Sequence, residues 1–150
     1  MPAASYWPMP TLLAPLLMGL SAWLPNAAVA AAKEPDLASV NAAIARYQTS
    51  YGDILSDISC DAPTITARTL MCDASYENDD LLWKMGRLDD MAWVYAYENG
   101  TKREVDHDDP PRDKAFLKER DACRNVQCVK AVLMRHTDES LGGESPYHAR

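Results

Sequence analysis

The segment Phe116–Val132, FLKERDACRNVQCVKAV, decides how the C-terminal half of the chain folds. It contains Cys123 and Cys128. Residues five apart on one continuous helix lie about 140° apart around the axis and roughly 7.5 Å apart along it. A disulfide cannot join two cysteines in that geometry. Either a turn therefore interrupts the helix at residues 124–127, or these two cysteines bond elsewhere.

The other two cysteines, Cys60 and Cys72, lie in the segment SCDAPTITARTLMCD at residues 59–73. Four cysteines allow three pairings. The short loops favour Cys60 with Cys72 and Cys123 with Cys128, while the crossed pairings, which tie the early segment to the late helices, stay open. Zinc would favour a CxxC element, which the chain lacks, so we expect disulfides and no metal or cofactor.

The N-terminal segment is typical of an export signal. No charged side chain precedes Lys33, and residues 12–24 form an apolar block that is too short to span a bilayer comfortably. Small residues follow at 28–32, as a signal peptidase requires. We expect residues 1–30 to be removed, with cleavage extending to residue 32 as the alternative. The mature chain is then periplasmic or secreted, without a membrane anchor.

Composition limits the class of partner. The chain has 150 residues, of which 47% are hydrophobic and 25% charged, as in one ordinary globular domain. Acidic residues outnumber basic ones by 22 to 15, which gives a formal net charge of −7. Nucleic acids and anionic membranes bind basic surfaces, so the composition argues against both and suits a basic protein as the partner. The alternative is that a moderate negative charge merely keeps the domain soluble.

Apolar residues recur at helical spacing over most of the mature chain. Residues 36–58 and 76–100 each predict one long helix, and residues 112–141 predict two short helices joined by a turn. Residues 101–113 contain almost no apolar side chain and two adjacent prolines, which predicts a solvated loop. Residues 142–150 predict a flexible tail. The fold class is therefore all-α, a small disulfide-stapled bundle of about four helices after a cleaved signal peptide.

Few patterns point to chemistry. The adjacent acids Asp89 and Asp90 point about 100° apart on a helix, and the chain has neither a GxSxG motif nor a phosphate-binding glycine loop. The DHDD run at 106–109 lacks the regular ligand spacing and the glycine turn of a calcium site. We therefore expect a protein that is not an enzyme and has no catalytic residue. The tryptophans and tyrosines at 83–97 are expected in the core, with a ligand groove as the alternative.

Three elements of the sequence occur in one order: CDAPTITARTLMC at 60–72, LDDMAWVYAY at 88–97 and FLKERDACRNVQCVKAVL at 116–133. Together they resemble the LprI-type lysozyme inhibitor family, a small exported helical module of bacteria with four cysteines. The similarity covers residues 59–141. The resemblance implies that these residues form an LprI-like helical domain, which follows the N-terminal amphipathic helix at residues 31–58. At Arg68 the family usually has glutamate.

The resemblance implies an exported acidic binding protein that blocks a lysozyme or a related peptidoglycan-cutting enzyme. An animal-type lysozyme is basic, so an acidic binder gains electrostatic steering. The alternative is a periplasmic helical binding or structural module with another envelope protein as its partner. The candidate partner-binding residues are Asp106, His107, Asp108 and Asp109, because their loop is acidic and its prolines limit the entropy lost on binding. A merely solvated surface loop is the competing interpretation.

Overall fold

The computed structural model describes residues 35–75 and 80–148 and shows only helices in that part of the chain. The five α-helices are α1 (Leu37–Tyr51), α2 (Thr66–Ser75), α3 (Leu81–Thr101), α4 (Lys114–Ala122) and α5 (Val126–Leu141), and a short 3₁₀ helix, η1 (Gly142–Glu144), follows α5. The all-α prediction is confirmed, with five helices in place of about four. The predicted signal peptide lies outside the described residues. No helix in the described ranges has the length and apolar character of a membrane span.

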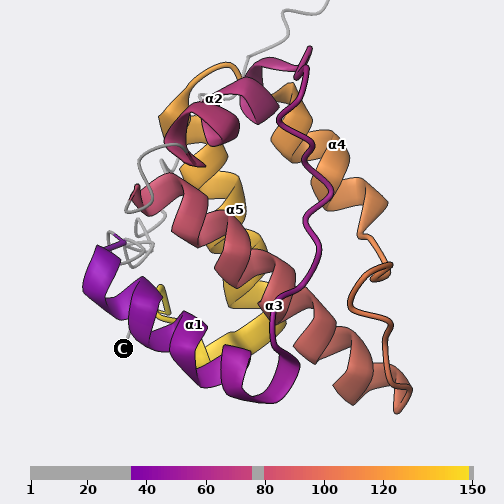
Figure 1. Ribbon diagram of the computed structural model, residues 1–150. Helices are drawn as coiled ribbons and strands as arrows, with labels where there is room; N and C mark the ends of the chain where they lie inside the picture. The colour runs from indigo at the N-terminus through magenta and orange to yellow at the C-terminus, as the bar shows by residue number, and fades with distance from the viewer. Residues whose placement is uncertain (1–34, 76–79, 149–150) are drawn as a thin grey trace, which may run out of the picture.

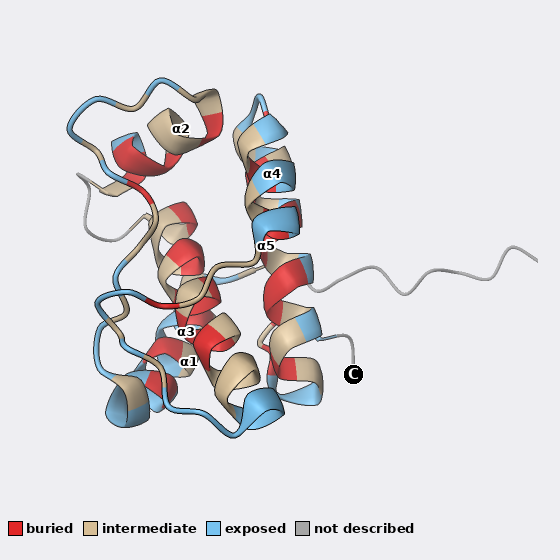
Figure 2. Ribbon diagram, turned by 90° about the vertical axis from the view of Figure 1, so that its right-hand side faces the viewer, coloured by how far each residue is buried: buried red, intermediate tan, exposed pale blue. Residues whose placement is uncertain are grey.

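Helix α3 forms the centre of the bundle. It packs against α1, α2 and α5, whereas α4 packs against α2 and α5 at one end of the molecule (Figure 1). The buried faces of α3 and α5 meet (Figure 2), and burial of their apolar side chains supplies the main stabilisation. The most completely buried side chains of these two helices are Leu82, Met85, Leu88, Met91, Val94, Val129 and Leu133.

Helix α1 ends earlier than its periodicity predicts. Asp36 caps its start by accepting the N–H of Ser39 at 2.8 Å. The helix stops at Tyr51 because Gly52 adopts φ 64°, a conformation that breaks the helix and that glycine adopts most easily. The prediction that it continues to Ile58 is therefore wrong. Residues 52–59, which we call the crossover segment, leave α1 without helical structure and run along α3 towards α2 (Figure 1).

Two disulfides fix the ends of α2 and the junction of α4 with α5. Cys60 is bonded to Cys72, the first disulfide, and Cys123 to Cys128, the second disulfide, with Cα atoms 5.5 Å apart in each. The favoured pairing is thus confirmed. The turn that the second pair requires lies between α4 and α5, where Asn125 accepts the N–H of Cys128 at 2.9 Å and begins the new helix.

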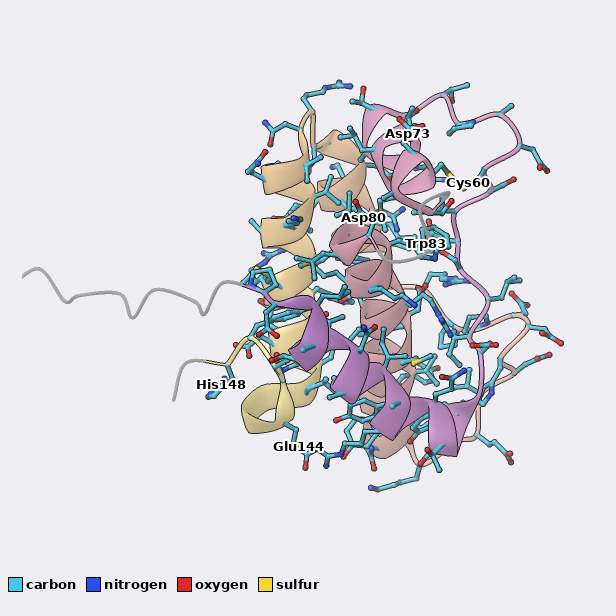
Figure 3. All side chains as sticks on the ribbon, turned by 60° about the vertical axis from the view of Figure 1, so that its left-hand side comes forward. Cys60, Asp73, Asp80, Trp83, Glu144 and His148 are labelled. Carbon is cyan, nitrogen blue, oxygen red and sulfur yellow. A yellow bond between two sulfur atoms is a disulfide. The ribbon has the colours of Figure 1, made fainter. Side chains whose placement is uncertain are left out.

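The C-terminal segment is packed and does not form the flexible tail that the sequence predicts. Tyr147 is only 3% exposed and belongs to the hydrophobic core. Glu144 accepts hydrogen bonds from Arg46 at 2.9 Å and Tyr47 at 3.0 Å, both on α1. Figure 3 labels Glu144 and His148 near this end of the bundle. Burial of one aromatic side chain and these contacts hold residues 142–148 against the bundle, and the last two residues lie outside the described range.

Candidate functional site

The predicted partner-binding loop is a tight turn attached to the crossover segment. Asp106 accepts the N–H of Asp108 on its carboxylate at 3.0 Å and the N–H of Asp109 on its carbonyl at 3.2 Å. The His107 carbonyl accepts the N–H of Leu55 at 3.0 Å. The centroid of the His107 ring lies 6.1 Å from that of the Tyr51 ring. Two of the four predicted residues, Asp106 and His107, therefore build the turn itself, and Asp108 lines the groove described next.

An open groove of about 450 Å³ lies between the crossover segment, α3 and this turn. Cavities of this size are within the range of known ligand sites. Its walls come from four separate parts of the chain. The lining residues are Asp53, Ile54, Leu55, Ser56, Met71, Trp83, Gly86, Arg87, Asp90 and Asp108. Figure 3 labels Trp83 on α3 and Cys60 directly after the crossover segment.

One wall of the groove presents apolar surface to solvent. Leu55 is 56% exposed, and it is the one large hydrophobic side chain that is exposed in the described ranges. Trp83 and Ile54 are partly buried beside it. At Gly86 a Cβ atom would lie 2.5 Å from Cε of Met71, so the absence of a side chain lets Met71 pack against α3. The groove thus combines an exposed aliphatic side chain, an aromatic ring and a closely packed floor.

The charged residues of the groove are mainly acidic. The lining acids are Asp53, Asp90 and Asp108, and the one lining cation is Arg87, which forms an ion pair with Asp53. Asp90 is paired with Arg112, whose Nη1 lies 3.4 Å from its carboxylate. Burial and, after it, the neighbouring Asp89 together raise the pKa of Asp90 to about 8, although Arg112 opposes them. The deepest acid is therefore protonated in much of the population at neutral pH.

An ion-pair cluster holds the crossover segment in place. Arg120 donates two hydrogen bonds of 2.7 Å to Asp57 and also bonds Asp121 at 2.9 and 3.1 Å. Arg68 donates to the other oxygen of Asp121 at 2.7 Å. Burial alone would raise the pKa of the Asp57 and Asp121 carboxyls, but the two guanidinium groups outweigh it and lower both. A second connection is the hydrogen bond from Arg112 to the carbonyl of Leu55 at 2.6 Å.

A second polar cluster is buried between α3, α4 and α5. Nδ1 of His136 lies 3.0 Å from both oxygens of Asp89, which also accepts the hydroxyl of Thr137 at 2.8 Å. The His136 ring stacks on Phe116 at 3.9 Å, and its Nε2 lies 3.6 Å from Asp113 without a hydrogen bond. His136 is therefore buried in the bundle, where this set of partners compensates its burial.

This buried cluster resembles an acid–base pair but offers no room for a substrate. The cavity beside it holds about 10 Å³, close to the volume that one water needs. In residues 35–75 and 80–148 there is also no group of three or more histidine, cysteine or acidic side chains placed to hold a metal ion. The groove is therefore the better candidate for a functional site.

Of the groove residues, Asp108 is the one that the sequence predicts to bind a partner. Trp83 is predicted as a core residue, with a ligand groove as the alternative, and Asp90 as one of two diverging helical acids. Asp53 and Leu55 are predicted within a helix that in fact ends before them. Gly52 is the residue in the sequence that marks the end of this helix, but the apolar periodicity alone does not take it into account.

Comparisons of the chain with protein-family models, with curated proteins and with solved structures found no match.

Proposed function

We propose that the mature chain is an exported acidic binding protein that blocks a lysozyme or a related peptidoglycan-cutting enzyme. The observation that carries the proposal is the groove, where three carboxyl side chains lie beside an exposed leucine and a tryptophan. Complementary charge steers a basic partner to such a surface, and the apolar wall supplies the contact area that charge alone does not.

Two further properties support this proposal. The net charge of −7 favours encounter with a basic protein over an acidic one. Both disulfides suit an oxidising compartment, where peptidoglycan-cutting enzymes act on the cell wall. A rigid, cross-linked bundle also loses little conformational freedom when it binds.

The test is a turbidity assay of peptidoglycan lysis by basic animal-type lysozymes, with the chain from residue 31 added at increasing molar ratio. We expect protection that weakens as ionic strength rises, because the attraction is between exposed charges. The groove variant Asp53→Asn/Asp90→Asn/Asp108→Asn should lose most of the protection.

The matched control replaces the same number of acids away from the groove, at three exposed positions: Asp61→Asn/Asp73→Asn/Glu139→Gln. Because Asp90 is largely protonated at neutral pH, the control removes at least as much negative charge as the groove variant. It should keep most of the protection. If the wild-type chain gives no protection at large molar excess over several lysozymes, the proposal is wrong, and the envelope binding module with another partner takes its place. Equal loss in both variants would mean that net charge, not the groove, is responsible.

A further inference from the structure

The groove also shows which part of a partner it fits. We infer that it binds one arginine or lysine side chain of the partner, with the aliphatic stem against Trp83 and Leu55 and the charged head at Asp90. This inference deepens the proposed function and rests on it for the identity of the partner, but the groove chemistry is tested separately below.

The apolar wall of the groove suits the stem of a long basic side chain. Long basic side chains bury their methylene stems on apolar surface while the charged end stays with polar groups. Leu55 and Ile54 on the crossover segment and Trp83 on α3 supply such a surface within one groove. An indole ring also attracts a cation placed over its face, which a purely aliphatic wall does not. The groove volume of about 450 Å³ leaves room for a complete side chain.

The side chain of Asp90 has unused hydrogen-bonding capacity. An ionised carboxylate accepts about four hydrogen bonds. Among the described residues, the one hydrogen bond to the Asp90 side chain is the long one from Arg112, at 3.4 Å. The adjacent Asp89, in contrast, is bonded to both His136 and Thr137. The side chain of Asp90 is only 18% exposed and lines the groove, so a donor that enters the groove gains a buried acceptor.

The charge around the groove favours a cation as the occupant. Arg87 is already paired with Asp53, and Asp108 adds a further carboxylate on the side of the turn. A second copy of this acidic chain is disfavoured as the occupant by its own charge of −7, and an anionic ligand would meet these carboxylates. A cationic side chain is the occupant that complements the groove.

This arrangement couples binding to loss of a proton. The charged groups that act on Asp90 are Asp89 on α3, Asp57 on the crossover segment, Arg120 on α4 and Arg112 before it. Without a bound cation, the pKa of Asp90 is about 8, chiefly because of burial. A cation in the groove lowers this pKa, so below pH 8 Asp90 releases a proton when the cation binds. The affinity should therefore rise by about tenfold between pH 6.5 and pH 8.5.

The probes for the experiment are N-acetyl-arginine amide and its neutral isostere N-acetyl-citrulline amide, titrated into the ¹⁵N-labelled chain from residue 31. The indole N–H of Trp83 reports occupancy by NMR. At pH 8.5 we expect the arginine probe to bind about tenfold more tightly than the citrulline probe. Asp90→Asn should reduce this preference to less than about threefold, and Asp73→Asn, an exposed acid on α2, should leave it unchanged.

Three results would overturn the inference. They are equal binding of the two probes, a preference that persists in Asp90→Asn, and a concentration-dependent dimer of the chain that buries Trp83 without any probe. Thermal unfolding of Asp90→Asn checks that the variant is folded. Because no lysozyme is present, these results are independent of the lysis assay: a chain that binds the arginine probe and fails to protect peptidoglycan keeps the groove chemistry and loses the proposed target.

Discussion

Replacing Arg120 by methionine tests whether the ion-pair cluster holds the crossover segment, and with it the groove, in place. The Arg120 side chain is 3% exposed and donates four hydrogen bonds to Asp57 and Asp121. Removal of one partner from a buried charged cluster costs about 3–5 kcal/mol, because the remaining charges are left without compensation. Arg68 still neutralises part of the charge, and both carboxylates keep slight exposure, so we expect about 3 kcal/mol.

The control substitution is Arg135→Met. Arg135 also forms an ion pair, with Glu119, but both side chains are 49% exposed, and exposed pairs contribute about 0–1 kcal/mol. Urea unfolding followed by far-UV circular dichroism at pH 7 gives the free energy of unfolding of each variant. If Arg120→Met costs no more than Arg135→Met, the cluster does not stabilise the fold as described.

The pH dependence separates lost charge compensation from lost packing. The folded-state pKa values of Asp57 and Asp121 lie below their unfolded values, so the stability they contribute is present above about pH 4 and is lost as the pH falls through the folded values. In Arg120→Met these carboxyls lose one of their two shared cations and keep only the other, Arg68, so they protonate more easily. The difference between wild type and variant should therefore shrink as the pH falls to about 3. A difference that stays constant down to that pH would indicate that packing is responsible.

Three further predictions concern the core and the disulfides. Gly86→Ala should destabilise the wild type by roughly 1 kcal/mol because the new Cβ atom meets Met71, and it should be neutral or stabilising in a Met71→Ala background. Chemical denaturation of the wild type, the two single variants and the double variant checks this. An equal cost in both backgrounds would contradict it. Burial lowers the pKa of His136, yet Asp89 outweighs it and raises that pKa above 6.5, so the associated stability is present below pH 6.5 and lost above the folded pKa. NMR titration of Asp89→Asn should find the His136 pKa lowered by at least about one unit, and an unchanged value would refute the assignment. Replacing the first disulfide by two alanines should lower the free energy of unfolding by about 3 kcal/mol, and replacing the second should lower it by about 2 kcal/mol, because the first closes the longer loop. In thermal unfolding, the variant without the first disulfide should therefore have the lower melting temperature.

The elements that sequence predicts well depend on local constraints. Continuous periodicity predicts α3, and the five-residue spacing of Cys123 and Cys128 predicts the break between α4 and α5. The end of α1 is not predicted by periodicity, because Ile54 and Ile58 continue its apolar spacing while they pack as parts of an extended segment. The backbone conformation at Gly52 decides that these residues form the crossover segment and do not continue the helix.

The groove depends on contacts between distant segments, which no local pattern contains. Leu55 and Asp108 are brought together by the hydrogen bond from Leu55 N–H to the carbonyl of His107. Tyr147 is buried by a similar long-range effect, since the segment around it contains no helical period. The acidic loop could be identified from composition, but the apolar wall beside it required the fold.

The most direct test of the account is a titration of the ¹⁵N-labelled chain with an unlabelled basic lysozyme, followed by backbone NMR shifts at low salt. We expect the changes to concentrate at residues 52–59, 83–90 and 106–109, which form the groove. Addition of salt should reverse these shift changes, because it screens the attraction between exposed charges. Changes confined to another face of the bundle, or no change at equimolar lysozyme, would contradict the claim that this groove receives a basic protein partner.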